Sequence, residues 1–265
     1  MRSRKYIALL TFVLCLTSPQ SIRAQDLAAF EETVTEFTLE NGLTFLLVER
    51  HEAPVVSFMT YADVGSVDEV KGITGIAHIF EHMAFKGTKT IGTKDLNKEY
   101  AAMSEVDDAF KKLRLERHKG HLADPERIAA LEKLFEDARK AAQAWAVSNE
   151  MDEAIDRVGG VGLNATTSVD ATRYFYSLPS NKIELFFSLE SDKFLNPVLR
   201  EFYTEKNVVM EERRMRTESN PVGRLLEEMV TTAYKAHPYG EPTVGHMSDL
   251  ATVTRSEGQD FFNTY

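Results

Sequence analysis

The chain carries the run Gly75-Ile76-Ala77-His78-Ile79-Phe80-Glu81-His82-Met83. Residues four apart lie on one face of an α-helix, so His78 and His82 can direct their imidazole nitrogens at one metal ion. Glu81 lies about 100° from His82 around the helix, where it can border the same site without filling a ligand position. Two neutral imidazoles, a third ligand and an open position describe a catalytic zinc site, and a neighbouring carboxylate can serve as its general base. The alternative is an ordinary helix that happens to contain two histidines.

The segments around this run predict a short helix that packs directly behind a sheet. Residues 33–49 alternate in polarity and contain Asn41-Gly42, a strong two-residue turn signal, so they predict a β-hairpin. The apolar run 55–61 predicts a third strand. Gly75 opens the helix, and Gly87 is its expected C-terminal cap.

A long helical zone follows the metal-motif helix. Residues 94–104 have a helical pattern, and residues 105–157 are rich in Ala, Glu, Lys, Arg and Leu with few β-branched residues. Pro125 begins an amphipathic run, which predicts a helical hairpin over this zone. His118 and His121 fall near its turn, where a solvated turn is a better interpretation than a ligand pair.

Two strand-like segments come next, at 163–168 and 172–179. Small and hydroxyl-bearing residues at 165–168 favour an edge strand whose backbone is left open. Such an edge can add an extended peptide as an extra strand, through main-chain hydrogen bonds that ignore side-chain identity. An ordinary edge strand, blunted by small polar residues, is the alternative.

The predicted helix 199–217 contains Glu205 and Glu212, which are seven residues apart and therefore two turns apart on one face. Glu212 could supply a third, oxygen ligand, and Glu205 could accept a hydrogen bond from a ligand histidine and orient it. The run Glu211-Glu212-Arg213-Arg214 would also be unremarkable on a charged, solvent-exposed helix, so that alternative stays open.

The first residues resemble a secretory signal. Arg2, Arg4 and Lys5 precede a mainly apolar stretch, 6–16, which is too short for a membrane span, and a cleavage site is plausible after Ala24. Cys15 is the single cysteine, so the mature chain would have neither a disulfide nor a cysteine ligand. Export without disulfides favours the bacterial periplasm, with an extracellular location as the alternative.

Charge and composition exclude some partners. The formal charge is -10, and removing the four basic residues of the signal brings it near -14. This balance argues against nucleic acid and against a basic membrane-binding face, while it permits a preference for basic peptides. No stable membrane span is expected after signal removal. With 43% hydrophobic residues, the chain can bury a substantial core.

Taken in order, these stretches resemble the pitrilysin–insulinase family of zinc metallopeptidases, the inverzincins, which include mitochondrial processing peptidase. The resemblance extends from about Phe37 to Tyr265. It rests on five ordered stretches: Val64-Gly65-Ser66 with Glu69, Gly75 to Phe85 with Gly87-Thr88, Asn164-Ala165 with Tyr174, Glu205 with Glu212-Arg213-Arg214, and His237-Pro238-Tyr239-Gly240 with Gly245.

The resemblance implies an α+β fold of the LuxS/mitochondrial-processing-peptidase type, mainly an antiparallel sheet packed on helices, with one Zn²⁺ per catalytic domain. It implies that His78, His82 and Glu212 are the metal ligands and that Glu81 is the general base. Glu205 matches the first glutamate of the family's paired pattern. Asn164 and Ala165 match the edge strand that binds substrate.

Two departures from the family pattern bear on function. The zone of about 105–157 separates Glu212 from His82 more widely than in common members, which predicts a tolerated helical insertion within a domain spanning 25–265. The chain also stops before the further strands and domains of the family, so we expect a peptide substrate together with a second family subunit or the missing C-terminal domains. The leading hypothesis is a zinc endopeptidase acting on unfolded peptides. The alternatives are a non-catalytic partner subunit or peptide-binding module of the same fold, and a truncated product without activity.

Overall fold

The computed structural model describes residues 27–265, which divide into two compact units between Ala53 and Pro54. The predicted signal, residues 1–24, lies outside the described residues. The first unit holds a short helix, α2 (Leu27–Glu31), and an antiparallel pair of strands, β1 (Val34–Thr38) and β2 (Thr44–Val48). Gly42 has a φ of 88° in the connecting turn, and the hairpin predicted over 33–49 is confirmed.

The second unit is built on a three-stranded antiparallel sheet with the order β3-β5-β4. β3 is Val55–Ala62, β4 is Val161–Thr167, and β5 is Thr172–Pro179. Every second residue of the central strand β5 is buried, from Thr172 to Leu178, because successive side chains point to opposite faces. β4 lies at an edge of this sheet, as its composition predicted.

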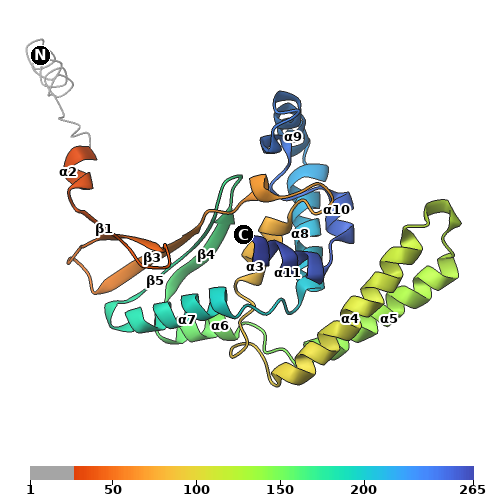
Figure 1. Ribbon diagram of the computed structural model, residues 1–265, viewed down its shortest axis with the longest axis horizontal. Helices are drawn as coiled ribbons and strands as arrows, with labels where there is room; N and C mark the ends of the chain where they lie inside the picture. The colour runs from red at the N-terminus through yellow and green to blue at the C-terminus, as the bar shows by residue number, and fades with distance from the viewer. Residues whose placement is uncertain (1–26) are drawn as a thin grey trace, which may run out of the picture. The chain divides into compact units, whose positions relative to one another are not determined.

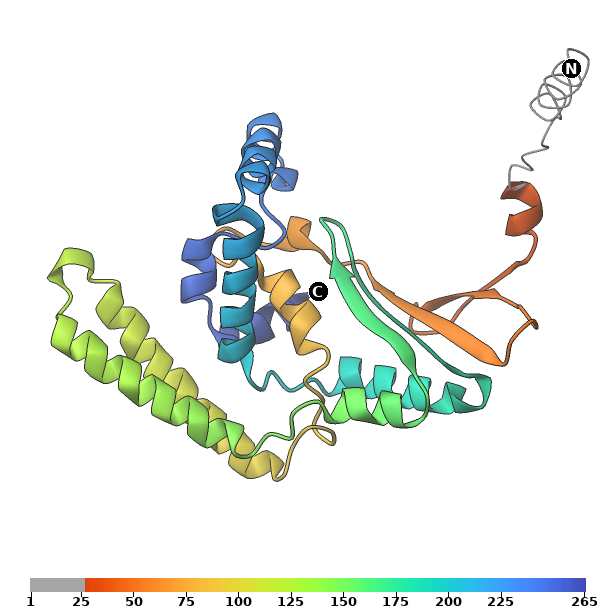
Figure 2. The same ribbon diagram turned by 180° about the vertical axis from the view of Figure 1, so that it is seen from behind.

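Two helices cover one part of the sheet. These are α6 (Glu150–Arg157) and α7 (Ile183–Leu195), which lie side by side in both views (Figures 1 and 2). Ile155 of α6, Leu178 of β5 and Phe186 of α7 belong to one buried cluster. Gly160 lies so close to Ile155 that a Cβ there would be 2.4 Å from the isoleucine side chain, so α6 and β4 meet through a tight junction.

A second core holds the helices that will carry the site. It joins α3 (Ile76–Met83), α8 (Phe202–Arg213), α10 (Met247–Thr252) and α11 (Arg255–Thr264). Ile79, Phe202, Val209 and Leu250 are among its most buried members. Among the remaining elements are the helix α9 (Pro221–Ala233), the π-helical segment Arg214–Glu218, and the 3-10 turns Ser66–Asp68, Ser180–Lys182 and Pro238–Gly240.

The predicted helical hairpin is present as α4 (Leu96–Arg117) and α5 (Pro125–Gln143), which pair closely along their length (Figure 2). α4 is one continuous helix, so the boundary expected near residue 105 falls inside it, because Val106 and Phe110 anchor that helix in the second core. His118 and His121 lie exposed at the turn, in agreement with the sequence.

One expected cap is wrong. α3 ends at Met83, and its C-cap is Ala84, three residues before the expected cap Gly87. Gly87 instead allows its backbone to lie close to that of Ile91: its φ is 95°, and a Cβ there would lie 2.3 Å from the carbonyl oxygen of Ile91. No helix within residues 27–265 is both long and apolar enough to cross a membrane.

Candidate metal centre and active site

The helix α3 begins at a junction of two chain segments. Gly75 is its N-cap, and a Cβ on Gly75 would lie 2.6 Å from the carbonyl oxygen of Val244. The Glu69 carboxylate accepts hydrogen bonds from the backbone amides of Gly75 and Ala77, each at 2.8 Å. Although these bonds oppose it, burial raises the pKa of Glu69 to about 8.

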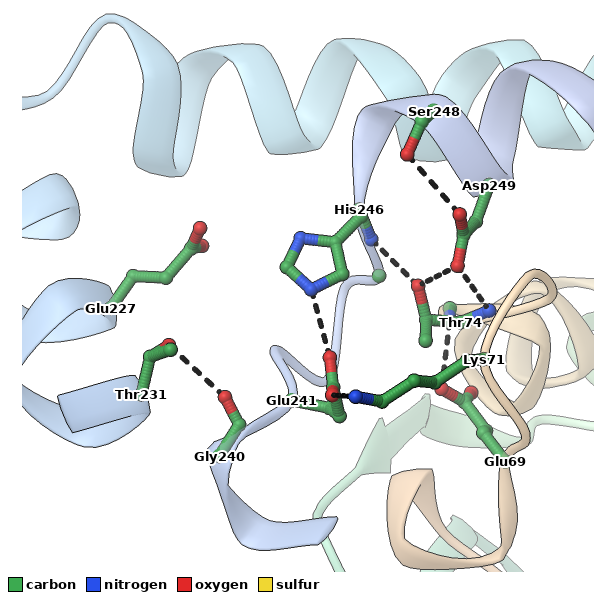
Figure 3. Close-up of polar contacts among 12 residues, drawn as sticks. Glu69, Lys71, Thr74, Glu227, Thr231, Gly240, Glu241, His246, Ser248 and Asp249 are labelled. Atoms are coloured by element: carbon green, nitrogen blue, oxygen red, sulfur yellow. Dashed lines mark hydrogen bonds and ion pairs between the residues drawn. The ribbon is translucent and has the colours of Figure 1, made fainter. Parts of the chain in front are cut away.

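A second carboxylate stabilises the junction between the start of α3 and the segment 241–249 (Figure 3). Asp249 Oδ2 accepts from the Thr74 hydroxyl at 2.8 Å and from the Thr74 amide at 3.2 Å. The Thr74 hydroxyl in turn accepts from the backbone amide of His246 at 2.9 Å, and the His246 ring bonds to Glu241 at 2.8 Å. The start of α3 is thereby fixed to the segment 241–249.

α3 and α8 pack together and bring three predicted ligands to one point. Nε2 of His78 is 3.6 Å from Oε2 of Glu212, and Nε2 of His82 is 3.6 Å from Oε1 of the same carboxylate. One potential ligand atom from each of the three residues lies within 4.8 Å of the others. It is the single group of this kind in the part of the chain that the structure describes.

The three residues fit a zinc ion. Ligand atoms at about 2.1 Å from a tetrahedral metal are roughly 3.4 Å apart, close to the observed nitrogen–oxygen distances. Oε2 of Glu212 is buried and has no hydrogen-bond partner within residues 27–265, so it is an acceptor available for a cation. Two imidazoles and one carboxylate form a donor set known from catalytic zinc sites.

The pKa shifts of the two histidines agree with the binding of a metal ion. Burial lowers the pKa of His78 to about 4, with smaller contributions from His82 and Arg216, so the ring is neutral at pH 7 and keeps a lone pair. Burial also lowers the pKa of His82, but the hydrogen bond to Glu205 and the charge of Glu212 outweigh it and raise that pKa overall. The carboxylates that favour positive charge on His82 favour a divalent cation at the same place.

Glu205 orients His82. Its Oε2 is 3.3 Å from Nδ1 of His82, and because a carboxylate only accepts, Nδ1 carries the hydrogen and Nε2 is left to face Glu212. Lys86 holds the other oxygen of Glu205 at 2.7 Å and lies 3.8 Å from Glu201. Burial would raise the pKa of Glu205, but its bonds to His82 and Lys86 lower it on balance.

Glu81 stands beside this cluster without belonging to it. Its Oε2 is 4.0 Å from Nε2 of His78 and accepts a hydrogen bond from the Thr167 hydroxyl at 2.5 Å. Thr167 is the last residue of β4, so the candidate base is held by the end of the edge strand.

A cavity of about 720 Å³ opens over these groups. All the predicted site residues line it: His78, Glu81, His82, Asn164, Ala165, Glu205 and Glu212. Within β4, Ala165 is buried, whereas Asn164 is exposed and its side chain accepts from the Ala165 amide at 2.8 Å. Residues 163–167 of the edge strand thus form one wall of the cavity.

Three neighbours of the site were not predicted: Lys86, Thr167 and Arg216. The Arg216 guanidinium is 3.4 Å from Oε2 of Glu212, and it lies in the π-helical segment that continues α8. Lys86 and Thr167 contact partners that are distant in sequence, so no local pattern identifies them. Arg216 follows Glu212 by four residues, and this i, i+4 spacing on one helix could have indicated the pair. The other histidines lie outside the cavity lining; His237, for example, caps the turn Pro238–Gly240 through its ring.

The sheet, the packed helices and the His78–His82–Glu212 cluster together define an α+β protein with a candidate metal centre. A family model for insulinase, peptidase family M16, matches residues 44–113 and 112–246. The chain therefore belongs to the M16 family of peptidases, as its motifs suggested.

Curated relatives carry names from the same family. The chain is 29% identical over 259 residues to "Zinc protease PqqE" of Helicobacter pylori, covering 97% of this chain and 45% of the relative. It is 24% identical over 244 residues to "Probable mitochondrial-processing peptidase subunit beta" of Schizosaccharomyces pombe, covering 90% of this chain and 40% of that protein. The chain spans less than half the length of these relatives.

Solved structures show the same fold. A protease from Helicobacter pylori matches with a TM-score of 0.63 and 28% identity, over 88% of this chain and 43% of that one. The periplasmic protease PqqL of Escherichia coli matches with a TM-score of 0.60 and 20% identity, over 88% of this chain and 20% of that one, which supports the fold alone. The expected α+β fold of this family is confirmed.

Proposed function

We propose that the chain is the catalytic part of a zinc-dependent endopeptidase that hydrolyses unfolded peptides. The observation that carries this proposal is the convergence of His78, His82 and Glu212 with Glu81 on one cavity that an open edge strand lines. The zinc-protease names of the relatives support the choice of metal. Because those relatives are more than twice as long, the activity, substrate and partners of the whole protein are part of the proposal.

In this proposal His78, His82 and Glu212 hold one zinc ion. Zinc in such a site activates a water molecule and polarises the carbonyl of the bond to be cleaved. Glu81 accepts the proton of the attacking water and later passes it to the leaving amine. Thr167 donates to Oε2 of Glu81, so it fixes the carboxylate and leaves Oε1 to take the proton.

The peptide lies along β4 as an added strand. β4 pairs with β5 on one side, and its residues 163–167 line the cavity on the way to Glu81. Main-chain hydrogen bonding would place a peptide bond beside the metal cluster without selecting its side chains. The same bonding requires an extended chain, so folded substrates are excluded unless they expose one.

The periplasm is the proposed compartment. The signal-like start of the sequence favours export, and the absence of further cysteines favours the periplasm over a disulfide-stabilised extracellular location. One structural neighbour is described as a periplasmic protease. A fusion of residues 1–24 to a reporter that is active only after export tests the signal directly.

The function is tested by Glu81→Gln. We expect this variant to lose cleavage of an unfolded, fluorescently quenched peptide by at least about 10²-fold, since general-base catalysis contributes that much, while bound zinc stays equimolar. Glu211→Gln is the matched control, because Glu211 is adjacent to Glu212 but exposed and paired with Arg214. Equal rates for the parent and Glu81→Gln would contradict the mechanism. Peptide binding without cleavage by the parent would favour a non-catalytic peptide-binding subunit.

A further inference from the structure

The cavity also has an acidic lining residue that does not belong to the metal cluster. Two residues at the start of α6, Asn149 and Asp152, line the cavity together with Leu163 and Asn164 from the first half of β4. α6 packs near the start of β4 through Gly160 and Ile155, whereas Glu81 meets the last residue of β4. A peptide lying along β4 toward Glu81 would therefore pass Asn149 and Asp152.

Asp152 has an unmet hydrogen-bonding requirement. Its Oδ1 is buried and has no hydrogen-bond partner within residues 27–265. Asn149 has a left-handed backbone, with φ of 62°, and its side chain does not cap the helix that follows. The cavity wall thus contains two side chains that can accept hydrogen bonds and that have no part in the metal cluster. They are three residues apart at the start of one helix.

Nearby charges leave this region negative. The charge of Lys86 acts on Asp152, but the Lys86 ammonium is bound to Glu205 at 2.7 Å and no ion pair between Lys86 and Asp152 is formed within residues 27–265. Glu150, Asp152 and Glu153 all lie in the first turn of α6. Burial, followed by the charge of Asp156, raises the pKa of Asp152 and outweighs the opposing charge of Lys86.

One basic side chain stands among the carboxylates of the metal cluster. Arg216 lines the cavity beside Glu212, and 67% of its side chain is exposed. An anionic side chain of the substrate would be attracted to this guanidinium and repelled from Asp152. The two regions therefore differ in the charge of the side chain that each can accept.

We propose that Asp152 and Asn149 form a subsite for a lysine or arginine side chain of the peptide bound along β4. A cationic side chain would provide the donor that Asp152 lacks and offset the cost of burying its charge. This inference rests on the proposed function, because it assumes that the cavity binds peptides. It adds a selectivity that main-chain pairing alone does not provide.

The test is a lysine scan of peptide binding. An uncharged, unfolded fluorescent peptide and variants with a single lysine at successive positions are titrated against the zinc-loaded Glu81→Gln chain by fluorescence anisotropy. At least one lysine position should bind roughly tenfold more tightly than the lysine-free peptide, the equivalent of one good charge pair. Adding Asp152→Asn should abolish that preference and leave binding of the lysine-free peptide within about twofold.

Two further variants control this result. Asp156→Asn removes the same charge from the same helix at an exposed residue outside the cavity lining, so the lysine preference should persist. Asp152→Glu keeps the charge and should retain most of the preference. The inference is wrong if the preference survives Asp152→Asn, or if Asp156→Asn reduces it equally. Failure of every peptide to bind would instead contradict the proposed function, and the subsite with it.

Discussion

Individual side chains outside the predicted cluster determine how the cluster can act. Glu205 selects the His82 tautomer, Lys86 holds Glu205, and Thr167 holds Glu81. Each contact is made by a residue distant in sequence from its partner or on another element. The properties of the candidate site at the scale of single residues therefore depend on a surrounding layer of hydrogen bonds.

Replacing Glu205 tests the role of the hydrogen bonds that surround the metal cluster. Glu205→Gln keeps an acceptor for Nδ1 of His82 but removes the charge that favours a cation there and the ion pair with Lys86. We expect zinc affinity to fall about 10–100-fold, as is usual for partners that orient metal ligands. Competition with a chromophoric chelator measures the affinity. Glu201→Gln, which alters the more distant partner of Lys86, should change it far less, and comparable losses in both variants would refute the orienting role.

At the scale of elements, the position of α3 depends on the contact between two backbone segments. Gly245 has a φ of 80°, and a Cβ there would lie 2.3 Å from the Thr74 carbonyl oxygen and 2.5 Å from Gly75 Cα. The Arg213 side chain, next to Glu212, donates to the Gly245 carbonyl oxygen at 2.7 Å. One junction thus connects both helices that carry the metal-ligating candidates.

Gly245→Ala should disturb this junction. The added methyl group meets backbone rather than a movable side chain, so we expect a loss of about 3 kcal/mol or more in the free energy of unfolding, together with weaker zinc binding. Gly120→Ala is the matched control, because Gly120 also has a positive φ, 59°, but a Cβ there meets nothing within 4 Å. That variant should lose only about 1–2 kcal/mol. Chemical denaturation of both variants gives the comparison, and equal losses would argue against the close contact.

At the scale of the whole molecule, several carboxylates hold distant segments together. Asp249 connects the segment before α3 with α10, and Glu257 caps α11 and pairs with Arg114 of α4. Burial would raise the pKa of Asp249, but its bonds from Thr74, Ser248 and Gly72 lower that pKa below its ordinary value of 3.8. The ionised form is therefore preferred more strongly in the folded than in the unfolded chain.

This difference predicts an acid-sensitive fold. Since the unfolded chain binds more protons near and below pH 3.8, the contribution of Asp249 is complete above that pH and is lost as the pH falls through the lowered pKa of the folded state. Asp249→Asn should lower stability at pH 7 and reduce the fall in stability below about pH 4. Urea denaturation across this range measures both effects, and an unchanged pH profile in the variant would contradict the assignment.

The sequence by itself determined the local half of the candidate site. The spacing of His78, Glu81 and His82 places them on one helix through the 3.6-residue period, and the same period puts Glu205 and Glu212 on one face of α8. The hairpin turn at Asn41-Gly42 and the start of α5 at Pro125 are equally local, because they depend on the φ/ψ preferences of a few adjacent residues. The ordered motifs also identified the family, which the comparisons confirm.

Only the tertiary structure decided which faces meet. α3 and α8 are separated by more than a hundred residues in sequence, and hydrophobic packing is not directional, so no local pattern could show that Glu212 turns toward the histidines rather than toward solvent. The bond from Thr167 to Glu81 and the position of Asp152 in the same cavity depend on that packing. The continuity of α4 through residue 105 has the same origin, because Val106 and Phe110 are buried by neighbours far away in the sequence.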